Sequence, residues 1–155
     1  NRAFADAWQD VVAAGGQILH AAGERNDIAD PGDPSYRIVP YIDRMDLAFA
    51  LADAVVSRSG AATVSELSAL GIPAVYVPYA VGNGEQALNA ASAVAAGAAV
   101  LIPDAELTGD RIRSAVVPLL SDAASLERMR AAAAQVGTRS GSENVVGLID
   151  RALAR

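Results

Sequence analysis

Polar side chains suited to binding a phosphorylated sugar follow two short apolar runs in the middle of the sequence. The segment Arg58-Ser59-Gly60 follows the run Ala54–Ser57, and Glu85-Gln86 follows the run Ala74–Val77 after a glycine-containing loop. A guanidinium group can meet a phosphate or stack beside a base, and a glycine lets the backbone approach a ligand closely. A carboxylate and an amide together can read sugar hydroxyl groups through paired acceptors and donors. The residue types therefore indicate a charged ligand that is rich in hydroxyl groups.

Glu66 is a further candidate, two turns into the helix predicted over Ala61–Leu70. Its carboxylate could accept hydrogen bonds from both hydroxyl groups of a ribose. The alternative is that Thr63 and Glu66 form only a capping box, which their spacing also fits. Because Ser59 and Gly60 already provide a turn, we favour the ribose-binding interpretation.

Arg58 and the two residues after it also have purely structural interpretations. Without further context, the Arg58 guanidinium would be expected to form a surface ion pair, with Asp53 or Asp43 as its partner. Ser59 and Gly60 would then serve only the turn between strand and helix. On the residues alone, both interpretations stay open.

The residues that open the next predicted helix have the same two interpretations. Glu85, taken alone, is best explained as an acidic residue that complements the helix dipole in the first turn. Asn89, one turn later, could support Gln86 or face solvent. His20, which ends an earlier apolar run, is predicted to be structural, since no serine or aspartate partner lies at a useful spacing. No catalytic residue is therefore predicted in this chain.

The elements that must position these residues alternate along the chain. Short apolar runs predict five strands, and residues recurring every three or four positions predict the helices. The alternation predicts an α/β fold, a Rossmann-like, doubly wound parallel sheet with right-handed crossovers and helices on both faces. Such sheets bind ligands at the carboxyl ends of their strands. The predicted strands are Gln17–Ala21, Tyr36–Val39, Ala54–Ser57, Ala74–Val77 and Ala98–Ile102; the predicted helices are Arg2–Ala14, a helix capped by Asp43 that ends at Ala52, Ala61–Leu70, Glu85–Ala96, Thr108–Leu120, Ala123–Gln135 and Ser142–Ala154.

The first predicted element is a helix, with Phe4, Trp8, Val11 and Val12 on its apolar stripe. A doubly wound domain normally opens on a strand and a glycine-rich turn instead, and that strand lies centrally in the sheet. We therefore expect the first strand and its loop to be absent, so that the sequence is a fragment of a longer chain.

Composition narrows the class of protein. Apolar residues make up 52% of the 155 residues, which is enough for one domain with its own core. The lack of cysteine fits a cytosolic protein, and with a single histidine it argues against a zinc site. No apolar run approaches the roughly 18–20 residues of a membrane span. A net charge of −6 without a basic cluster argues against nucleic acid as the main partner.

Taken together, the motifs resemble a known family. The ordered set resembles the nucleotide-sugar-binding half of GT-B glycosyltransferases, and more closely the carboxyl-terminal domain of the MurG family. The resemblance is strong from Tyr41 to Ile102 and weaker over the rest. It rests on Tyr41-Ile42-Asp43-x-Met45, Arg58-Ser59-Gly60, Glu66, Gly71-x-Pro73, Pro78 and Asn83-Gly84-Glu85-Gln86-x-x-Asn89-Ala90.

The resemblance implies a role for each matching residue on the nucleotide side of the site. The backbone of Ile42 would pair with the uracil edge. Arg58 and Ser59 would lie beside the nucleotide, where Gly60 allows close approach, and Glu66 would hold the ribose hydroxyl groups.

On the sugar side, the resemblance implies that Glu85 and Gln86 read the hydroxyl groups of N-acetylglucosamine. The matching motif extends to Asn89, which is predicted as a further substrate-binding residue. Many family members carry two glutamines at the Glu85-Gln86 pair, so Glu85 departs from the family pattern.

The family reaction is an inverting, metal-independent transfer of N-acetylglucosamine from UDP-N-acetylglucosamine (UDP-GlcNAc) to lipid I, which gives lipid II in peptidoglycan synthesis. The resemblance implies UDP-GlcNAc as a substrate, and neither a cofactor nor a metal. In the family, the amino-terminal domain supplies the general base, the lipid I site and the contact with the membrane surface. We therefore expect a single donor-binding domain from a two-domain enzyme, located in the cytoplasm at the inner face of the membrane and inactive alone.

Two alternatives stay open. The chain could belong to another enzyme of the same fold, such as a different UDP-sugar transferase or a non-hydrolysing UDP-GlcNAc epimerase. It could instead be a stand-alone donor-binding subunit that works with a membrane-anchored partner.

Overall fold

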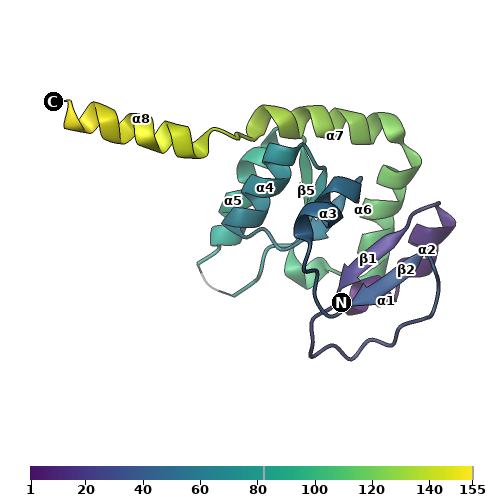
Figure 1. Cartoon of the computed structure of the whole chain (residues 1–155). Coiled ribbons are helices and arrows are strands. Elements are labelled where there is room, and N and C mark those ends of the chain that lie inside the picture. The colour runs from purple at the N-terminus through teal and green to yellow at the C-terminus, as the bar shows by residue number, and fades with distance from the viewer. Residues whose placement is uncertain (82, 155) are drawn as a thin grey trace.

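The computed structural model describes residues 1–81 and 83–154. Its five strands are all parallel and form two hydrogen-bonded sheets (Figure 1). In the first sheet, β1 (Ile18–Ala21) pairs with β2 (Tyr36–Val39). The second sheet has the order β3-β4-β5 and contains β3 (Val55–Ser57), β4 (Ala74–Tyr76) and β5 (Ala99–Leu101). The predicted strands are thus confirmed, but the predicted single sheet is corrected to two.

The division into two sheets has a topological reason. In the usual order of a doubly wound sheet, the first strand lies between the second and the fourth. A chain that supplies only the second to the sixth strand would form one sheet of two strands and one of three. This is the division observed, with β1 and β3 each hydrogen-bonded to one neighbouring strand among the described residues.

Helices precede, separate and follow these strands, and most predicted ends agree with the structure to within two residues. Gly71 ends α4 with a positive φ of 71°, as expected for a glycine stop. Thr108 caps α6 by accepting the Arg111 N–H, and Asp122 caps α7 by accepting the Ser125 N–H. The helices are α1 (Arg2–Ala5), α2 (Trp8–Ala13), α3 (Met45–Leu51), α4 (Ala61–Leu70), α5 (Glu85–Ala95), the short 3₁₀ helix η1 (Asp104–Glu106), α6 (Gly109–Ser121), α7 (Ala123–Val136) and α8 (Gly141–Leu153).

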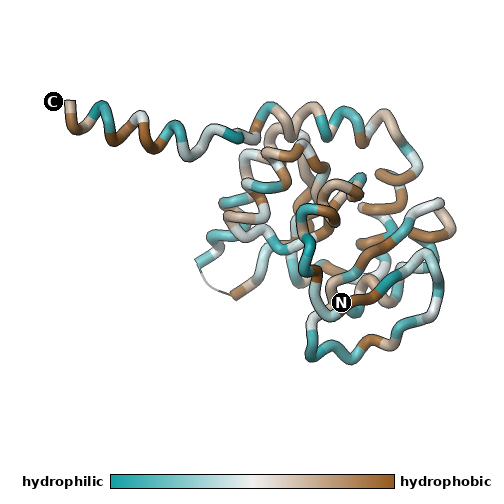
Figure 2. The backbone as a smooth tube through the Cα atoms, viewed as in Figure 1, coloured by the Kyte–Doolittle hydropathy of each residue, from teal (hydrophilic) through white to brown (hydrophobic). Residues whose placement is uncertain are grey.

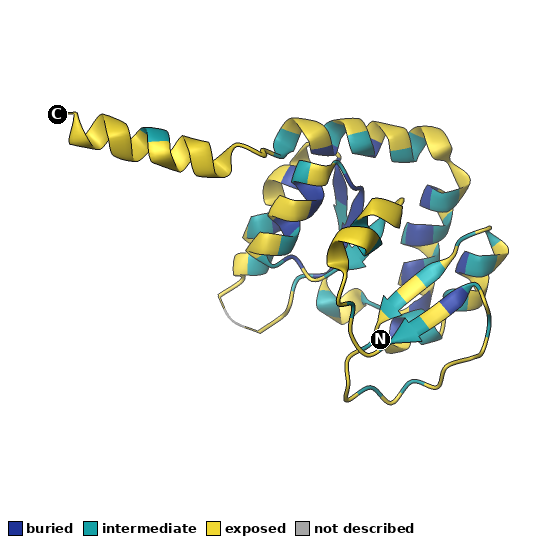
Figure 3. Cartoon of the chain, viewed as in Figure 1, coloured by how far each residue is buried: buried dark blue, intermediate teal, exposed yellow. Residues whose placement is uncertain are grey.

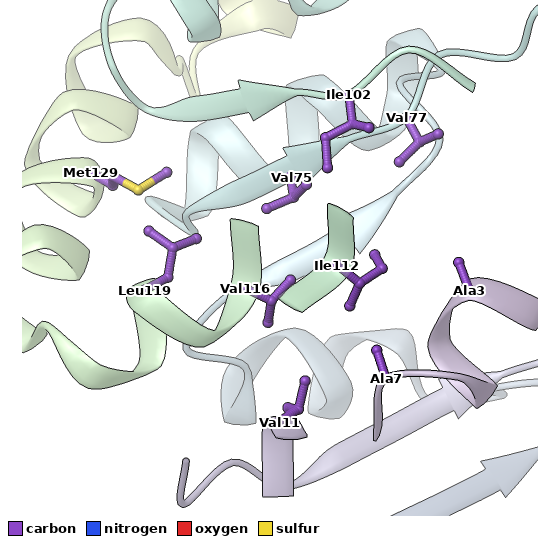
Figure 4. Close-up of a cluster of buried hydrophobic side chains, with 10 residues drawn as sticks. All are labelled: Ala3, Ala7, Val11, Val75, Val77, Ile102, Ile112, Val116, Leu119 and Met129. Carbon is purple, nitrogen blue, oxygen red and sulfur yellow. The ribbon is translucent and has the colours of Figure 1, made fainter. Parts of the chain in front are cut away.

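The core lies on both faces of the second sheet, because β4 is buried on both sides. Val75 and Val77 join one cluster with side chains of α1, α2, α6 and α7 (Figure 4). Ala74 and Tyr76 join a second cluster with side chains of α4, α5 and α7. This alternation is the period-two pattern of a strand covered on both faces. The predicted doubly wound arrangement is therefore confirmed for this sheet.

The first predicted helix is broken, and its buried stripe differs from the prediction. Helices α1 and α2 are separated at Asp6 and Ala7, where Arg113 of α6 donates a 2.7 Å hydrogen bond to the Asp6 carbonyl. This bond from outside the helix engages a carbonyl at the point where the helix stops. The buried residues are Ala3, Ala7 and Val11, at a spacing of four. Of the four residues predicted on the stripe, only Val11 is buried, while Phe4, Trp8 and Val12 are half-buried.

The predicted cap at Asp43 is wrong. Arg44 is the residue before α3, and no side chain caps this helix. Arg44 instead forms an ion pair of 2.6 Å with Asp46, in the first turn. The helix therefore begins at Met45, two residues after the expected cap.

Helix α8 extends away from the rest of the molecule (Figure 1). It has no buried residue (Figure 3), and apolar and polar residues alternate along it (Figure 2). Among the described residues, no helix combines the length and the apolar character that crossing a bilayer requires. Its exposed apolar residues are Val145, Val146, Leu148, Ile149 and Leu153.

Candidate functional site

The carboxyl end of β3 leads directly into the amino terminus of α4. Ser59 is fully buried there, and its hydroxyl group has no hydrogen-bond partner among the described residues. Gly60 precedes the helix with φ −62° and ψ 149°, and no side chain caps the helix. A Cβ added at Gly60 would meet no atom within 4 Å, so the space before the helix is open. Free backbone N–H groups and the helix dipole make such an end suited to an anion.

Arg58 is engaged within the protein. Its Nη1 lies 3.2 Å from the carbonyl oxygens of Val77 and Pro78, and it forms an ion pair with Asp104 of η1. The guanidinium also lies over the Tyr79 ring, 5.3 Å from its centroid. One side chain therefore connects the end of β3 with the segments that follow β4 and β5.

The predicted ion pair of Arg58 with Asp53 or Asp43 is therefore wrong. Asp53 pairs instead with Arg130 of α7, at 2.6 Å. A role for Arg58 beside the nucleotide stays a prediction.

Gln86 lies in the first turn of α5 and holds the loop before it. Its Oε1 accepts a 2.9 Å hydrogen bond from the Tyr79 N–H. The side-chain Nε2 has no partner among the described residues, and an amide nitrogen can only donate. Glu85, at the start of α5, is exposed, and its N–H donates to Asn83 Oδ1 at 3.2 Å. Gln86 can therefore offer a donor to a ligand, and Glu85 an acceptor.

Asn89 connects the two helices of the site. Its Nδ2 donates a 3.1 Å hydrogen bond to the Ser59 carbonyl, and the side chain is half-buried. The expectation that Asn89 supports Gln86 or faces solvent is corrected, since its partner lies at the end of β3. The structure thus brings Asn89 together with Ser59 and Gly60.

Asn89 also lines a groove of about 230 Å³ between α4, α5 and the end of α7. Most of the polar lining consists of hydroxyl groups, which can both donate and accept. The lining residues are Ala61, Val64, Ser65, Ser68, Asn89, Ser92, Val136, Gly137 and Thr138.

Glu66 lies on another side of α4 and is exposed. Because α4 begins at Ala61 after Gly60, Thr63 is inside the helix and cannot be its cap. The capping-box interpretation of Glu66 is therefore wrong. Glu66 lines a second groove, of about 600 Å³, between α3 and α4. Its other lining residues are Met45, Asp46, Phe49, Ala69, Leu70 and Arg139.

Ile42 is half-buried and lies three residues before Met45, which lines this second groove. The candidate residues are thus arranged around α4, with Asn89 on one side and Glu66 on the other. Arg58, Glu85 and Gln86 all contact the β4–α5 connection. The two grooves are separate, so Glu66 and Asn89 share no groove.

His20 has a structural environment, as predicted. Its Nδ1 lies 2.7 Å from Tyr36 Oη and its Nε2 lies 3.1 Å from Asn1 Oδ1. The ring stacks on Tyr36 and contacts Phe4, and burial lowers its pKa below 6.5. At the end of β4, burial also raises the pKa of Tyr76 to about 12. The contacts of His20 thus join β1 to Tyr36 of β2 and to Asn1.

Two residues of the site were not predicted. Asp104 pairs with Arg58, and Tyr79 lies beneath the Arg58 guanidinium. The sequence offers one signal for Asp104, since it follows the last predicted strand as Arg58 follows the third. The sequence offers no such signal for Tyr79, because its contact with Arg58 depends on the path of the β4–α5 connection.

Comparisons with known proteins agree with this fold. Residues 4–145 match the family described as "Glycosyltransferase family 28 C-terminal domain". The chain is similar to the UDP-N-acetylglucosamine--N-acetylmuramyl-(pentapeptide) pyrophosphoryl-undecaprenol N-acetylglucosamine transferase of Clavibacter sepedonicus, with 52% identity over 154 residues. The alignment covers 99% of this chain and 42% of that relative.

The transferase of the same name from Mycobacterium leprae is 50% identical over 149 residues, covering 94% of this chain and 37% of the relative. The crystal structure of Acinetobacter baumannii MurG superimposes with a TM-score of 0.78 at 24% identity, covering 96% of this chain and 46% of that one. The last comparison supports the fold. The chain spans about two fifths of the length of these two curated relatives.

Proposed function

Because the chain belongs to the glycosyltransferase family 28 C-terminal domains, we propose that it binds the UDP-GlcNAc donor of an inverting glycosyltransferase. The whole protein would move N-acetylglucosamine to lipid I and form lipid II in peptidoglycan synthesis. The two transferase relatives support the choice of donor and acceptor, since the name that they share contains both. The chain would be one donor-binding domain of a longer, two-domain protein.

The observation that carries the proposal is the open amino terminus of α4. Three features lie together there: the space at Gly60, and a Ser59 hydroxyl and helix N–H groups for which the described residues offer no side-chain partner. When the glycosidic bond breaks, negative charge develops on the diphosphate of the leaving UDP. Fixed N–H dipoles aimed at this charge lower the barrier, because they need no reorganisation during the reaction.

The other candidate residues would bind and orient the donor. Glu66 would accept hydrogen bonds from the ribose hydroxyl groups, and the Ile42 backbone would meet the uracil edge. The free Nε2 of Gln86 would donate to the sugar, because its Oε1 is already engaged by Tyr79. Glu85 would accept from a sugar hydroxyl, and Asn89 would hold the Ser59 backbone where the diphosphate binds.

The acceptor side is proposed to lie in another domain. The carboxylates of Glu66 and Glu85 are assigned to the donor, so the general base, the lipid I site and the contact with the membrane would come from an amino-terminal domain, as the resemblance to the MurG family implies. The protein would act in the cytoplasm at the inner face of the membrane. Neither a metal nor a cofactor is proposed, because the N–H dipoles at α4 would act on the leaving group.

Binding and transfer by the full-length protein test the proposal. Calorimetry should show tighter binding of UDP-GlcNAc than of UDP-glucose, and lipid I should be converted to lipid II with and without a chelator. Conversion of UDP-GlcNAc to an epimer without transfer would instead support an epimerase. Donor binding without transfer, restored by a separate membrane protein, would support a stand-alone subunit.

A further inference from the structure

Asp104 contacts Arg58, which in turn contacts the start of the β4–α5 connection, and Asp104 has not yet been given a function. It belongs to η1, after β5, and forms an ion pair with Arg58 at the end of β3. About one third of the Asp104 side chain is exposed (32%), compared with 46% for Arg58. The pair is therefore partly shielded from water, and salt screens it less than a fully exposed pair.

The same guanidinium also reaches the segment that follows β4. Arg58 Nη1 lies 3.2 Å from the carbonyl oxygens of both Val77 and Pro78. The same nitrogen bonds to Asp104, so its two N–H groups are shared among the carboxylate and the two carbonyl oxygens. A planar guanidinium held by a carboxylate keeps its N–H groups in fixed directions. Asp104 thus orients the donors that hold the start of the β4–α5 connection.

The connection leads from these carbonyls to Gln86. The next residue, Tyr79, lies under the guanidinium, and its backbone N–H donates to Gln86 Oε1 at 2.9 Å. Asp104 is therefore linked to Gln86 through Arg58 and Tyr79. Each link is a contact of the described residues.

We propose that Asp104 is a positioning residue, which fixes the β4–α5 connection through Arg58 and so sets the direction in which Gln86 offers its Nε2 to the donor sugar. The inference rests on the proposed function only where it names the sugar as the ligand. Asp104 itself touches neither the ligand nor the reacting atoms. Replacing Asp104 is therefore expected to change the affinity for the donor and to leave the affinity for the acceptor unchanged.

The first arm of the test needs no ligand. Hydrogen exchange of the Tyr79 amide is compared between the wild-type full-length protein and its Asp104→Asn variant. Loss of the charge should make this amide exchange about tenfold faster, because the segment opens more often. Asp53→Asn serves as the matched control, since it removes an exposed ion pair with Arg130 away from the loop. Equal exchange in Asp104→Asn and wild type would overturn the proposal.

The second arm measures transfer kinetics. Because asparagine can still accept a hydrogen bond, Asp104→Asn should raise KM for UDP-GlcNAc by roughly fivefold to tenfold, the size of one ordinary hydrogen bond, and leave KM for lipid I unchanged. Asp104→Glu, which keeps the charge, should restore most of the affinity. A fall in kcat with both KM values unchanged would mean only less folded enzyme, and would overturn the positioning role.

The two arms also separate this proposal from the proposed function. If the wild-type protein binds no UDP-GlcNAc, the proposed function fails, and exchange at Tyr79 still decides whether Asp104 positions the loop. Arg58→Lys gives a second variant, because lysine keeps the charge without the fork. It should accelerate Tyr79 exchange as Asp104→Asn does, and unchanged exchange would count against the proposal.

Discussion

The side-chain amide of Asn89 donates a hydrogen bond of 3.1 Å to the backbone carbonyl of Ser59. This bond joins the second turn of α5 to the residue that precedes Gly60 at the open end of α4. Ser59 is fully buried, and its hydroxyl group has no partner within the described part of the chain, so its backbone position determines what that hydroxyl can reach. The bond therefore fixes the start of α4 relative to α5 at the candidate diphosphate site.

Replacing Asn89 should therefore weaken donor binding as well as stability. Asn89→Asp keeps the size of the side chain but removes its N–H donor, so the Ser59 carbonyl loses its partner. We expect a loss of about 1 kcal/mol in stability, typical of one hydrogen bond, and weaker binding of UDP by calorimetry. Ser92→Ala, in the same groove, is the control and should leave UDP binding as it is. Wild-type UDP affinity in Asn89→Asp would show that the bond does not position the site.

Glu66→Ala should weaken binding of UDP-GlcNAc about tenfold to a hundredfold, the range for hydrogen bonds to a charged group. The sharper test uses a donor that lacks both ribose hydroxyl groups. This analogue should bind Glu66→Ala and wild type equally, because the carboxylate has nothing to accept from it. Glu127→Ala, which removes an exposed carboxylate of α7, is the control. An equal loss of affinity for both donors in Glu66→Ala would remove Glu66 from the ribose site.

Periodicity in the sequence predicts local features of the fold but not contacts between distant segments. Strand and helix positions depend on local patterns, so the limits of α4 and the stop at Gly71 were predicted correctly. The break between α1 and α2 was not, and the Asp6 carbonyl at the break bonds to Arg113, more than a hundred residues later in the chain.

The candidate site shows the same limit. The sequence predicted that the ends of β3 and β4 would carry the ligand-binding residues, and the structure places Arg58 and Gln86 around one connection. The partners of Arg58 and Asn89 could not be predicted, since both bonds join segments that only the fold brings together. The division into two sheets was also not predicted, because pairing between strands depends on neighbours that no local pattern reveals.

Gly137→Ala should destabilise the protein strongly, because the end of α7 packs closely on α4. A Cβ at this position would lie 2.3 Å from both the carbonyl carbon and the carbonyl oxygen of Ser68, which are backbone atoms of α4 and cannot rotate away. We expect a loss of about 1–3 kcal/mol, as for other overpacked sites, measured by denaturant unfolding. Gly141→Ala is the matched control, because its Cβ would meet no atom within 4 Å. Similar stability of the two variants would contradict the close packing of the α7 end on α4.

Stability should fall in mild acid because of His20. Burial holds the pKa of His20 below 6.5, so the folded protein favours the neutral ring while the unfolded chain takes up a proton more readily. The stability contribution is therefore complete above pH 6.5, and it is lost as the pH falls through 6.5 towards the lowered pKa of the folded state. In His20→Gln, which does not titrate, Tm should change less between about pH 7.5 and pH 5 than in wild type. Since Gln can still bond to Tyr36 Oη, the variant isolates the charge from the contact. Parallel curves of Tm against pH for the two proteins would show that protonation of His20 does not affect folding.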